Sequence, residues 1–343
     1  MADRSLSVEV IPFALSFRRP YVTATGTLER RESVLLRIRD ENGITALGEG
    51  VPMTLRGGDG LARVVGELEA WAEDEILPAT PPARCALATA LADLEAKRRE
   101  LPLWRQLDPA APARRLKLNA TITAGPPDDV VAQCEAWAED GFEVFKLKAG
   151  PDEAIELAGA VRSALGPEAR IRLDANGTWG ERAAGLLAEL EPIGLELVEE
   201  PVTGLSELAS LSAGTTIPLV ADESVNTTAE AADARFEGAC AAATVKLTKI
   251  GGLDVTLGGH LPTYLSSALD GPVGIAAAAH AAQTLDPNLP WPEVAHGLAT
   301  ERLFREELSL SGPLTAGNEL DPPTEGFGLG VELDEKVLAS CRL

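Results

Sequence analysis

The sequence predicts an α/β protein in which a modified (β/α)7β TIM-type barrel carries an N-terminal α+β capping unit. From Leu116 onward, short apolar runs alternate with amphipathic segments, which is the pattern of a parallel sheet covered by helices. The repeat is about 25 residues long and occurs seven or eight times, which favours a closed barrel over an open sheet. Before Leu116, strand-like stretches precede helical ones. We therefore expect a cap at residues 1–100, a barrel at 101–309, and a last segment at about 310–343 that completes the cap.

The cap begins with strand-like stretches and continues with two helical segments. Glu41-Asn42-Gly43 is a turn signal inside the second stretch, so we expect this stretch to double back on itself. Apolar residues recur at helical spacing from Leu61 to Trp71. We expect strands at 5–16 and 30–47, loops at 17–27 and 48–60, and helices at 61–76 and 82–99.

Short apolar runs mark the strands of the barrel, and amphipathic segments separate them. We expect strands at 116–123, 144–148, 171–174, 195–199, 218–222 and 243–247, and a last one at either 273–276 or 264–269. We expect helices at 151–165, 181–190 and 227–237. The final segment is interrupted by Gly and Pro, which predicts irregular structure that folds back over the cap.

Acidic residues outnumber basic ones, and this limits the partners of the protein. The chain has 343 residues, with 53 Asp and Glu against 30 Lys and Arg, and a formal net charge of −23. This charge disfavours nucleic acid and anionic membrane surfaces as partners. It leaves an anionic small molecule open, because a local group of lysines and a metal ion can outweigh the global charge. The oligomeric state stays open.

The N-terminal stretch and the cysteines predict a cytoplasmic protein. The N-terminus lacks the apolar run of a signal peptide, and we find no stretch of about 18 apolar residues that would span a bilayer. The cysteines are scattered and form no ligand-like pair, so we expect reduced thiols at Cys85, Cys134, Cys240 and Cys341.

Two lysines lie two residues apart in an otherwise apolar strand, from Val144 to Lys148. Because side chains alternate between the faces of a strand, Lys146 and Lys148 point the same way. Burying two ammonium groups side by side is costly unless opposite charge lies nearby. The alternative is an edge strand whose lysines reach water.

Acidic residues stand at the ends of the next three strands. Asp174, Glu199 and Asp222 follow one another at intervals of about 25 residues, and Lys246 comes one interval later, so each lies one strand–helix unit further along. Carboxylates with an amide oxygen nearby suit a hard cation such as Mg²⁺. A single acid here is better explained as a helix N-cap, but three at successive strand ends, with lysines on both sides, favour a metal site.

The chain resembles the enolase superfamily, and within it the muconate lactonizing subgroup. The resemblance runs over nearly the whole chain and rests on motifs in this order: Lys146-Leu147-Lys148, Asp174-Ala175-Asn176, Val198-Glu199-Glu200-Pro201, Ala221-Asp222-Glu223-Ser224, and Val245-Lys246-Leu247 before Gly251-Gly252. It implies that Asp174, Glu199 and Asp222 bind Mg²⁺, with Mn²⁺ as a substitute. It also implies a lysine on each side of a carboxylate substrate, Lys148 and Lys246.

These implied roles agree with the chemistry of removing a proton next to a carboxylate. Such a proton is very weakly acidic, and a divalent cation stabilises the negative charge that develops when it leaves. We expect Lys148 to be the base, with its pKa lowered by the cation and by Lys146. We expect Lys246 to stay charged and to stabilise the enediolate.

The resemblance fixes the first chemical step but leaves four reactions: o-succinylbenzoate synthesis, N-succinylamino acid racemisation, dipeptide epimerisation and muconate cycloisomerisation. The stretch from Leu265 to Asp270 resembles o-succinylbenzoate synthases, which dehydrate 2-succinyl-6-hydroxy-2,4-cyclohexadiene-1-carboxylate in menaquinone biosynthesis. We therefore expect a lyase whose substrate contacts Asn176, Ser266 and Ser267. The serines fit a plain strand-to-helix turn almost as well.

Other readings stay open or are weakened. Dipeptide epimerases carry an Asp-x-Asp pair on the last barrel strand, and residues 291–298 contain none, but a racemase stays open. A non-catalytic metal- or ligand-binding barrel would keep the acids without needing lysines on both sides. Gly251-Gly252 is too short for a phosphate loop. We expect no site at His260, His280 or His296, which share no suggestive spacing.

Overall fold

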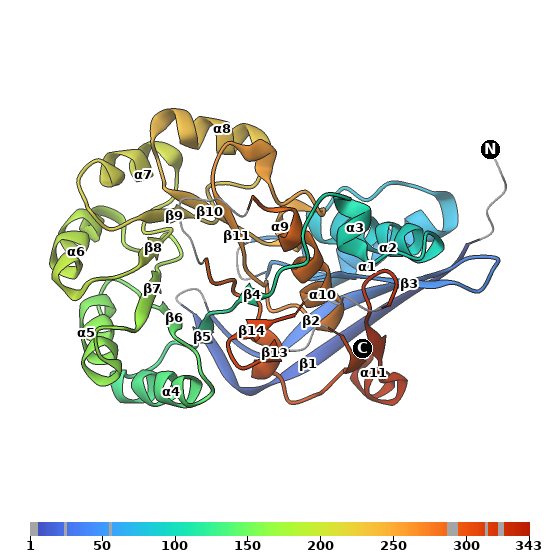
Figure 1. Cartoon of the computed structure of the whole chain (residues 1–343), viewed down its shortest axis with the longest axis horizontal. Coiled ribbons are helices and arrows are strands. Elements are labelled where there is room, and N and C mark those ends of the chain that lie inside the picture. Colours follow the sequence, from blue (N-terminus) through green and yellow to red (C-terminus); the bar gives the residue numbers. More distant parts are fainter. Residues whose placement is uncertain (1–5, 24–25, 55–56, 287–293, 313–314, 322–325) are drawn as a thin grey trace.

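The structure is a computed structural model that describes residues 6–23, 26–54, 57–286, 294–312, 315–321 and 326–343. It has two parts (Figure 1). A curled parallel sheet with helices around its outside occupies one end of the molecule, and a long antiparallel sheet with its own helices occupies the other. The predicted fold class, a β/α barrel with an N-terminal cap, is confirmed.

The barrel sheet contains seven parallel strands in sequence order. They are β5 (Ala120–Ile122), β6 (Val144–Lys148), β7 (Arg170–Asp174), β8 (Leu197–Glu199), β9 (Leu219–Ala221), β10 (Ala242–Val245) and β11 (Thr263–Leu265). A short segment closes the ring between the two edge strands. The backbone of His296 bridges to Leu118, and that of Gly297 bridges to Ser266. These bridges take the eighth strand position of the predicted (β/α)7β barrel.

Helices follow most of the strands and cover the outside of the barrel (Figure 1). They are α4 (Pro127–Glu139), α5 (Ala154–Leu165), α6 (Ala183–Leu190), α7 (Leu205–Ser212), α8 (Thr228–Glu237), α9 (Leu247–Ile250) and α10 (Pro272–Ala281). The start of α8 is set by a capping box in which Thr227 and Glu230 bond each other's backbone N–H groups.

One alternative for the last barrel strand is wrong. Residues 273–276 lie inside helix α10, whereas the strand is β11, at the start of the other proposed run. The apolar run in α10 is buried on all sides, and such a run has the same appearance in a central strand and in a buried helix. Pro272 occupies the first position of the helix, where proline is common, and it indicates that this run is a helix.

The cap consists of a three-stranded antiparallel sheet and the helices packed on it. The strands are β1 (Ser7–Thr23), β2 (Gly26–Arg39) and β3 (Thr45–Gly50), and the helices are α1 (Leu61–Asp74), α2 (Pro81–Arg98) and α3 (Leu103–Leu107). Helix α2 packs so closely on β3 that a Cβ atom at Gly48 would lie 1.9 Å from the carbonyl oxygen of Ala86. Only glycine fits there.

Two predicted loops of the cap are shorter than expected. Residues 17–23 belong to β1, whose register shifts between Ser16 and Tyr21, and residues 48–50 belong to β3. The polar sequence and Pro20 favoured a loop, but Phe17 stacks on Phe304, which is distant in the sequence, with ring centroids 4.9 Å apart. This tertiary contact holds the strand in place, and no local pattern indicates it.

The C-terminal segment returns to the cap and is more regular than its sequence indicates. It forms β12 (Ser309–Ser311), β13 (Thr315–Ala316), β14 (Glu319–Leu320), β15 (Glu332–Leu333) and α11 (Glu335–Cys341), and β14 pairs with β4 (Leu116–Lys117). Helix α11 is tied to the cap sheet. Glu335 pairs with Arg37 at 2.5 Å, and the backbone of Arg342 bridges to Phe13.

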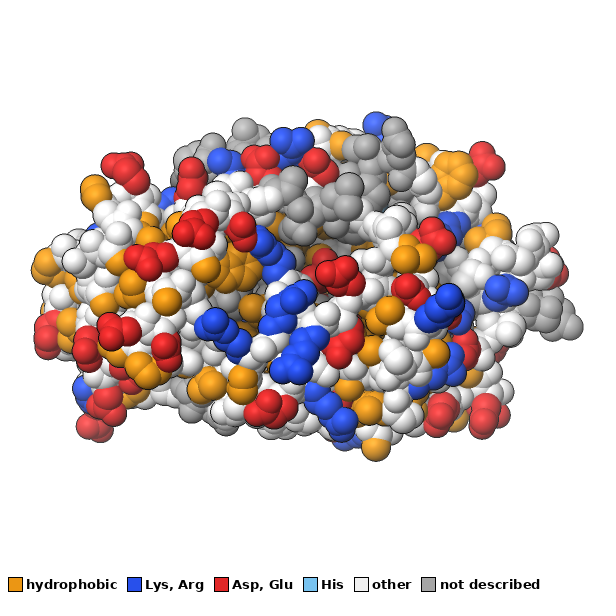
Figure 2. All heavy atoms as spheres, turned by 90° about the horizontal axis from the view of Figure 1, so that it is seen from below, with side chains coloured by type: hydrophobic (Ala, Val, Ile, Leu, Met, Phe, Trp, Pro, Cys, Tyr) orange, Lys and Arg blue, Asp and Glu red, His pale blue; other side chains and the backbone are white. Residues whose placement is uncertain are grey.

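The surface carries charges of both signs. On the face shown in Figure 2, acidic side chains are spread widely and basic side chains gather near the centre. In the described part of the chain, no helix is both long enough and apolar enough to cross a membrane.

Candidate active site

The register of the parallel strands brings the lysine strand and the acidic strand ends together. Lys148, at the end of β6, is the register partner of Asp174 on β7, and Asp174 is in turn the partner of Glu199 on β8. Asp222 follows β9, the next strand in the sheet. The carboxyl ends of barrel strands face one mouth, so the three acids stand on adjacent strands at that mouth.

All of these charged groups are buried. The exposed fraction is 1% for Asp174 and 0% for both Glu199 and Asp222. Lys146 and Lys148 are also buried, as is Lys246. The alternative of a solvated edge strand for the two lysines is therefore wrong. Buried charges of one sign require charges of the other, and the acids supply them.

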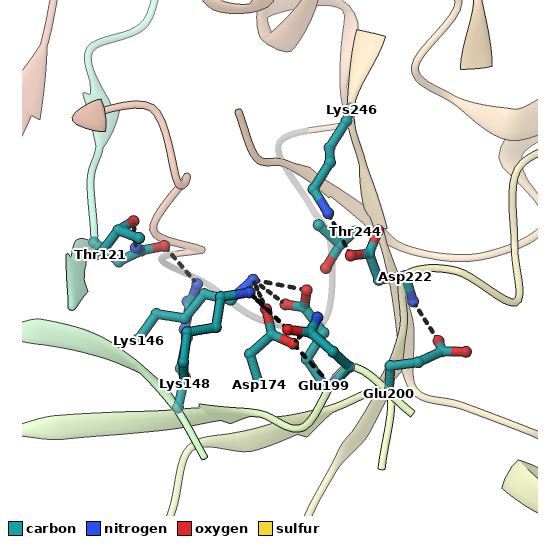
Figure 3. Close-up of polar contacts among 12 residues, drawn as sticks. Thr121, Lys146, Lys148, Asp174, Glu199, Glu200, Asp222, Thr244 and Lys246 are labelled. Atoms are coloured by element: carbon teal, nitrogen blue, oxygen red, sulfur yellow. Dashed lines mark hydrogen bonds and ion pairs between the residues drawn. The ribbon is translucent and has the colours of Figure 1, made fainter. Parts of the chain in front are cut away.

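The lysines reach the acids from two sides (Figure 3). Lys146 donates to both oxygens of Glu199 at 2.7 Å, and its Nζ lies 3.0 Å from Asp174 Oδ2. Lys148 donates to the same Asp174 oxygen at 2.5 Å. Lys246 approaches from the opposite side and donates to Asp222. Two lysines from β6 therefore lie on one side of the acids, and a single lysine after β10 lies on the other.

A second group of side chains orients these residues. The Asn176 side chain donates to Asp174 Oδ1 at 2.6 Å and accepts from Lys148 at 3.2 Å. The Tyr264 hydroxyl donates to Glu199 Oε2 at 2.8 Å. Lys249 donates to Asp222 Oδ1 at 2.8 Å. Each acid is therefore held by at least two donors.

The donor set suits a hard cation in kind, but in this arrangement the oxygens bind ammonium groups. Carboxylate oxygens on neighbouring strands are the ligands that Mg²⁺ prefers. Among the described residues, however, no three His, Cys, Asp or Glu side chains converge on one point as a metal site would need. Cation binding at Asp174, Glu199 and Asp222 would therefore exchange part of the lysine contacts for contacts to the ion.

Burial and charge pull the pKa values of this group in different directions. Burial disfavours the charged form of Lys146, but Asp174 and Glu199 outweigh it and hold the lysine pKa well above its usual range. Burial raises the pKa of Glu200 to about 7, although Ser224 and the backbone N–H of Asp222 donate to it. Glu200 thus braces the loop after β9 rather than joining the three acids.

A cavity lies against the lysines and contains about 680 Å³ of empty space, part of it open to solvent. Its walls combine side chains from the barrel and the cap: Tyr21, Leu28, Arg31, Met53, Thr121, Lys146, Lys148, Asn176, Lys246, Ser266, Ser267, Ala268, Leu269 and Thr300. All three residues expected to contact substrate, Asn176, Ser266 and Ser267, line this space. The cap and the barrel therefore enclose one shared site.

The hydroxyl of Ser267 is engaged in contacts inside the protein. Ser267 donates its hydroxyl to Asp270 Oδ2 at 2.9 Å and accepts from the Asp270 backbone N–H at 2.8 Å. Its only hydroxyl proton is therefore used inside the protein. This is the strand-to-helix turn that the sequence also allowed, so Ser267 lines the cavity without a free donor.

Sequence reasoning missed several residues around the site. Tyr264 carries no motif, and its hydroxyl reaches Glu199 only because the barrel closes. If the strand continued past Lys246, side-chain alternation would turn Lys249 to the opposite face, but β10 ends at Val245 and helix α9 turns this lysine back to Asp222. The signal for Lys249 was the Lys-x-x-Lys spacing at 246–249, which is one helical turn.

The buried histidines are structural. The backbone N–H of Leu265 donates to His296 Nδ1 at 3.0 Å, which ties β11 to the closing segment. His280 accepts from the backbone N–H of Trp104 at 3.1 Å, and its other ring nitrogen contacts the carbonyl of Leu329. The stretch in which no Asp-x-Asp pair was found, residues 291–298, lies partly outside the described residues, which omit 287–293.

The fold and the site together define a class: capped β/α barrels in which acids and lysines gather at the carboxyl ends of the strands. Comparison with known families assigns the chain within this class. The family model described as "Enolase C-terminal domain-like" matches residues 129–337, more than half of the chain. The chain belongs to the enolase superfamily.

Its relatives in this superfamily are enzymes with different reactions. The L-Ala-D/L-Glu epimerase of Bacillus subtilis is 28% identical over 80% of this chain and 84% of its own length. The o-succinylbenzoate synthase of Thermobifida fusca is 34% identical over 58% of this chain and 64% of its own. The muconate lactonizing enzyme of Pseudomonas fluorescens, solved with muconolactone, superposes with a TM-score of 0.89 at 25% identity and covers 99% of this chain and 100% of its own. Membership alone therefore leaves the reaction open.

Proposed function

We propose that this protein is an o-succinylbenzoate synthase, a lyase that dehydrates 2-succinyl-6-hydroxy-2,4-cyclohexadiene-1-carboxylate. The observation that carries the proposal is the placement of Lys148 and Lys246 on opposite sides of three buried carboxylates, at the wall of one cavity. A substrate in that cavity would have an amine on either face. This arrangement suits removal of a proton next to a carboxylate and stabilisation of the charge that results.

In the proposed reaction, Lys148 removes the proton alpha to the ring carboxylate. Lys246, still charged on the other side, stabilises the enediolate. Lys148 then returns its proton to the departing hydroxyl, so that water leaves from the same face and the ring becomes aromatic. Lys146 keeps its charge, because Asp174 and Glu199 raise its pKa, and so it favours the neutral form of the neighbouring Lys148.

We propose Asp174, Glu199 and Asp222 as the residues that hold a divalent cation, with Mg²⁺ as the natural ion and Mn²⁺ as a substitute. When bound, the cation would supply positive charge to the substrate carboxylate where the second negative charge develops. Asn176, which already bonds Asp174 and Lys148, would keep that acid and that base in fixed relation.

Two features support dehydration over the other reactions of the superfamily. The stretch from Leu265 to Asp270, which resembles o-succinylbenzoate synthases, lines the cavity at Ser266, Ser267 and Leu269. The relative with the highest identity among those described above is also such a synthase. N-Succinylamino acid racemisation is the alternative, because it uses the same two lysines and a substrate with the same succinyl group.

The experiment that tests the proposal compares two substrates. Purified protein with Mg²⁺ is assayed with the cyclohexadiene carboxylate and, separately, with an N-succinylamino acid in deuterated water. Efficient dehydration of the diene supports the synthase, and turnover of the amino acid alone would replace it with the racemase. Mg²⁺ binding by calorimetry without proton exchange on either substrate would indicate a non-catalytic binding barrel.

A further inference from the structure

Arg31 is a buried cation that the proposed mechanism does not use. It lies on β2 of the cap, with 7% of its surface exposed, and it lines the same cavity as Lys146, Lys148 and Lys246. Its Nε atom is fully buried and has no hydrogen-bond acceptor among the described residues. A buried donor without a partner is unfavourable, so a guanidinium in this position calls for an anion.

The acids near Arg31 are engaged elsewhere. Glu49 accepts the backbone N–H groups of Gly271 and Gly274, at 2.7 and 2.9 Å, at the start of helix α10. Asp270 accepts from the Ser267 hydroxyl and from the backbone N–H of Ala268, at 2.9 and 2.6 Å. Both carboxylates therefore serve the turn between β11 and α10, and they act on Arg31 only through their charge.

The charge balance around Arg31 leaves the guanidinium able to attract an anion. Burial lowers the pKa of Arg31 to about 10, so it stays charged at neutral pH. Burial and the neighbouring Asp270 raise the pKa of Glu49 to about 8, so this acid is largely neutral at pH 7. Of these three groups, Arg31 is the one that lines the cavity.

We propose that Arg31 binds the second carboxylate of the substrate, the one at the end far from the carbon that loses its proton. This inference rests on the proposed function, because it assumes that the first carboxylate lies among the acids and lysines. A guanidinium presents parallel N–H donors that match the two oxygens of a carboxylate. Ser267, one of the two serines expected to contact the substrate, has no free donor.

A site with cations at both ends selects dicarboxylates. The ring carboxylate would lie by the lysines of the barrel, and the succinyl carboxylate by Arg31 of the cap. A substrate with an ammonium or an uncharged group at the far end would leave Arg31 unpaired when the cavity closes around it. The cost of leaving Arg31 unpaired, rather than the chemistry in the barrel, would exclude such a substrate.

The test is a calorimetric comparison of two ligands at saturating Mg²⁺: the product o-succinylbenzoate and its methyl ester at the succinyl carboxylate. Wild-type protein should bind the free acid about 10- to 100-fold more tightly than the ester. Arg31→Met should remove most of this preference by weakening the acid and leaving the ester nearly unchanged. Arg31→Lys keeps the charge but loses the parallel N–H donors of the guanidinium, so its preference for the acid should lie between those of the wild type and Arg31→Met. Arg30→Met is the matched control, since Arg30 is exposed and pairs with Glu32.

The outcomes separate this inference from the proposed function. Equal binding of acid and ester by the wild type would overturn the role of Arg31 even if the diene is dehydrated efficiently, and this readout holds if Arg31→Met fails to fold. An acid preference that depends on Arg31 in a protein that does not dehydrate the diene would keep the dicarboxylate site and reject the synthase. Loss of affinity for acid and ester alike in Arg31→Met, with an unchanged unfolding temperature, would also overturn it.

Discussion

Lys146 donates to both carboxylate oxygens of Glu199, each at 2.7 Å, inside the mouth of the barrel. The two residues come from strands two places apart in the sheet, with β7 between them. A cation that uses Glu199 must therefore compete with this ammonium group for the same oxygens. Lys146 is therefore the counter-ion that stabilises the buried carboxylate in the folded protein. A metal ion that binds Glu199 would replace this ammonium group.

Lys146→Met should lower the free energy of unfolding by about 3 kcal/mol in the absence of divalent cations, because it leaves a buried carboxylate without its partner. Added Mg²⁺ should restore much of that loss, since the ion replaces the missing charge and no longer competes with the Lys146 ammonium group for Glu199. At a concentration 100-fold above its dissociation constant, an ion contributes about 2.7 kcal/mol. Denaturant unfolding with and without Mg²⁺ measures both effects.

Lys97→Met is the control for Lys146→Met. Lys97 pairs with Asp93, an acid of 0% exposure, at 2.7 Å in the cap. This variant should also be destabilised, but its response to Mg²⁺ should match that of the wild type. If Lys146→Met and wild type gain the same stability from Mg²⁺, the ion does not use Glu199.

Lys148→Ala should reduce dehydration and solvent deuterium exchange by about 10²- to 10⁴-fold, the usual contribution of a general base. Lys246→Ala should reduce turnover by about 10²-fold or more, because it removes a stabilising charge and not the base. Single-turnover exchange of the alpha proton measures the loss of proton abstraction in each variant. Circular dichroism shows whether the variant is still folded. Appreciable turnover by Lys148→Ala would contradict its role as the base.

Much of this site was predictable because barrels impose a simple geometry on sequence. Strand ends recur at a fixed interval, so Asp174, Glu199 and Asp222 could be placed side by side without coordinates. Lys146 and Lys148 share a face by strand parity alone, and the structure places both on the cavity wall. These inferences need only local patterns and one repeated unit.

The parts that could not be predicted depend on contacts between distant segments. Arg31 lies beside Arg30 in the sequence, and only the placement of the cap over the barrel shows that one is buried and the other exposed. Tyr264 meets Glu199 across the interior of the barrel. Local propensity contains none of this information.

Tyr264→Phe should weaken Mg²⁺ binding by about tenfold, the effect typical of residues that orient a metal ligand. The Tyr264 hydroxyl donates to Glu199 Oε2 at 2.8 Å, and its ring lies against the buried Arg172. Phenylalanine keeps the ring and removes only the hydrogen bond, so the loss of stability should be near 1 kcal/mol. Calorimetry with Mg²⁺ measures the first effect, and an unchanged affinity would show that this hydroxyl does not position the acid.

Thr248→Val should destabilise the junction between cap and barrel by about 2 kcal/mol. The Thr248 hydroxyl accepts from the backbone N–H of Val51 at 3.1 Å and donates to its carbonyl at 2.9 Å, and valine would leave both buried groups without partners. Thr248→Ser keeps the hydroxyl and serves as the control. Denaturant unfolding measures the difference, and equal stability of the two variants would contradict the role assigned to the hydroxyl.

His280 should make the protein sensitive to mild acid. Burial lowers its pKa from an ordinary 6.5 to about 4, so between these values the unfolded chain binds a proton that the folded chain does not. Stability from this group is complete above pH 6.5, falls as the pH drops toward 4, and changes little below that, for a total on the order of 3 kcal/mol. His280→Gln should reduce the dependence of unfolding free energy on pH in that window by about one proton. If His280→Gln keeps the wild-type slope, proton uptake on unfolding arises elsewhere in the chain.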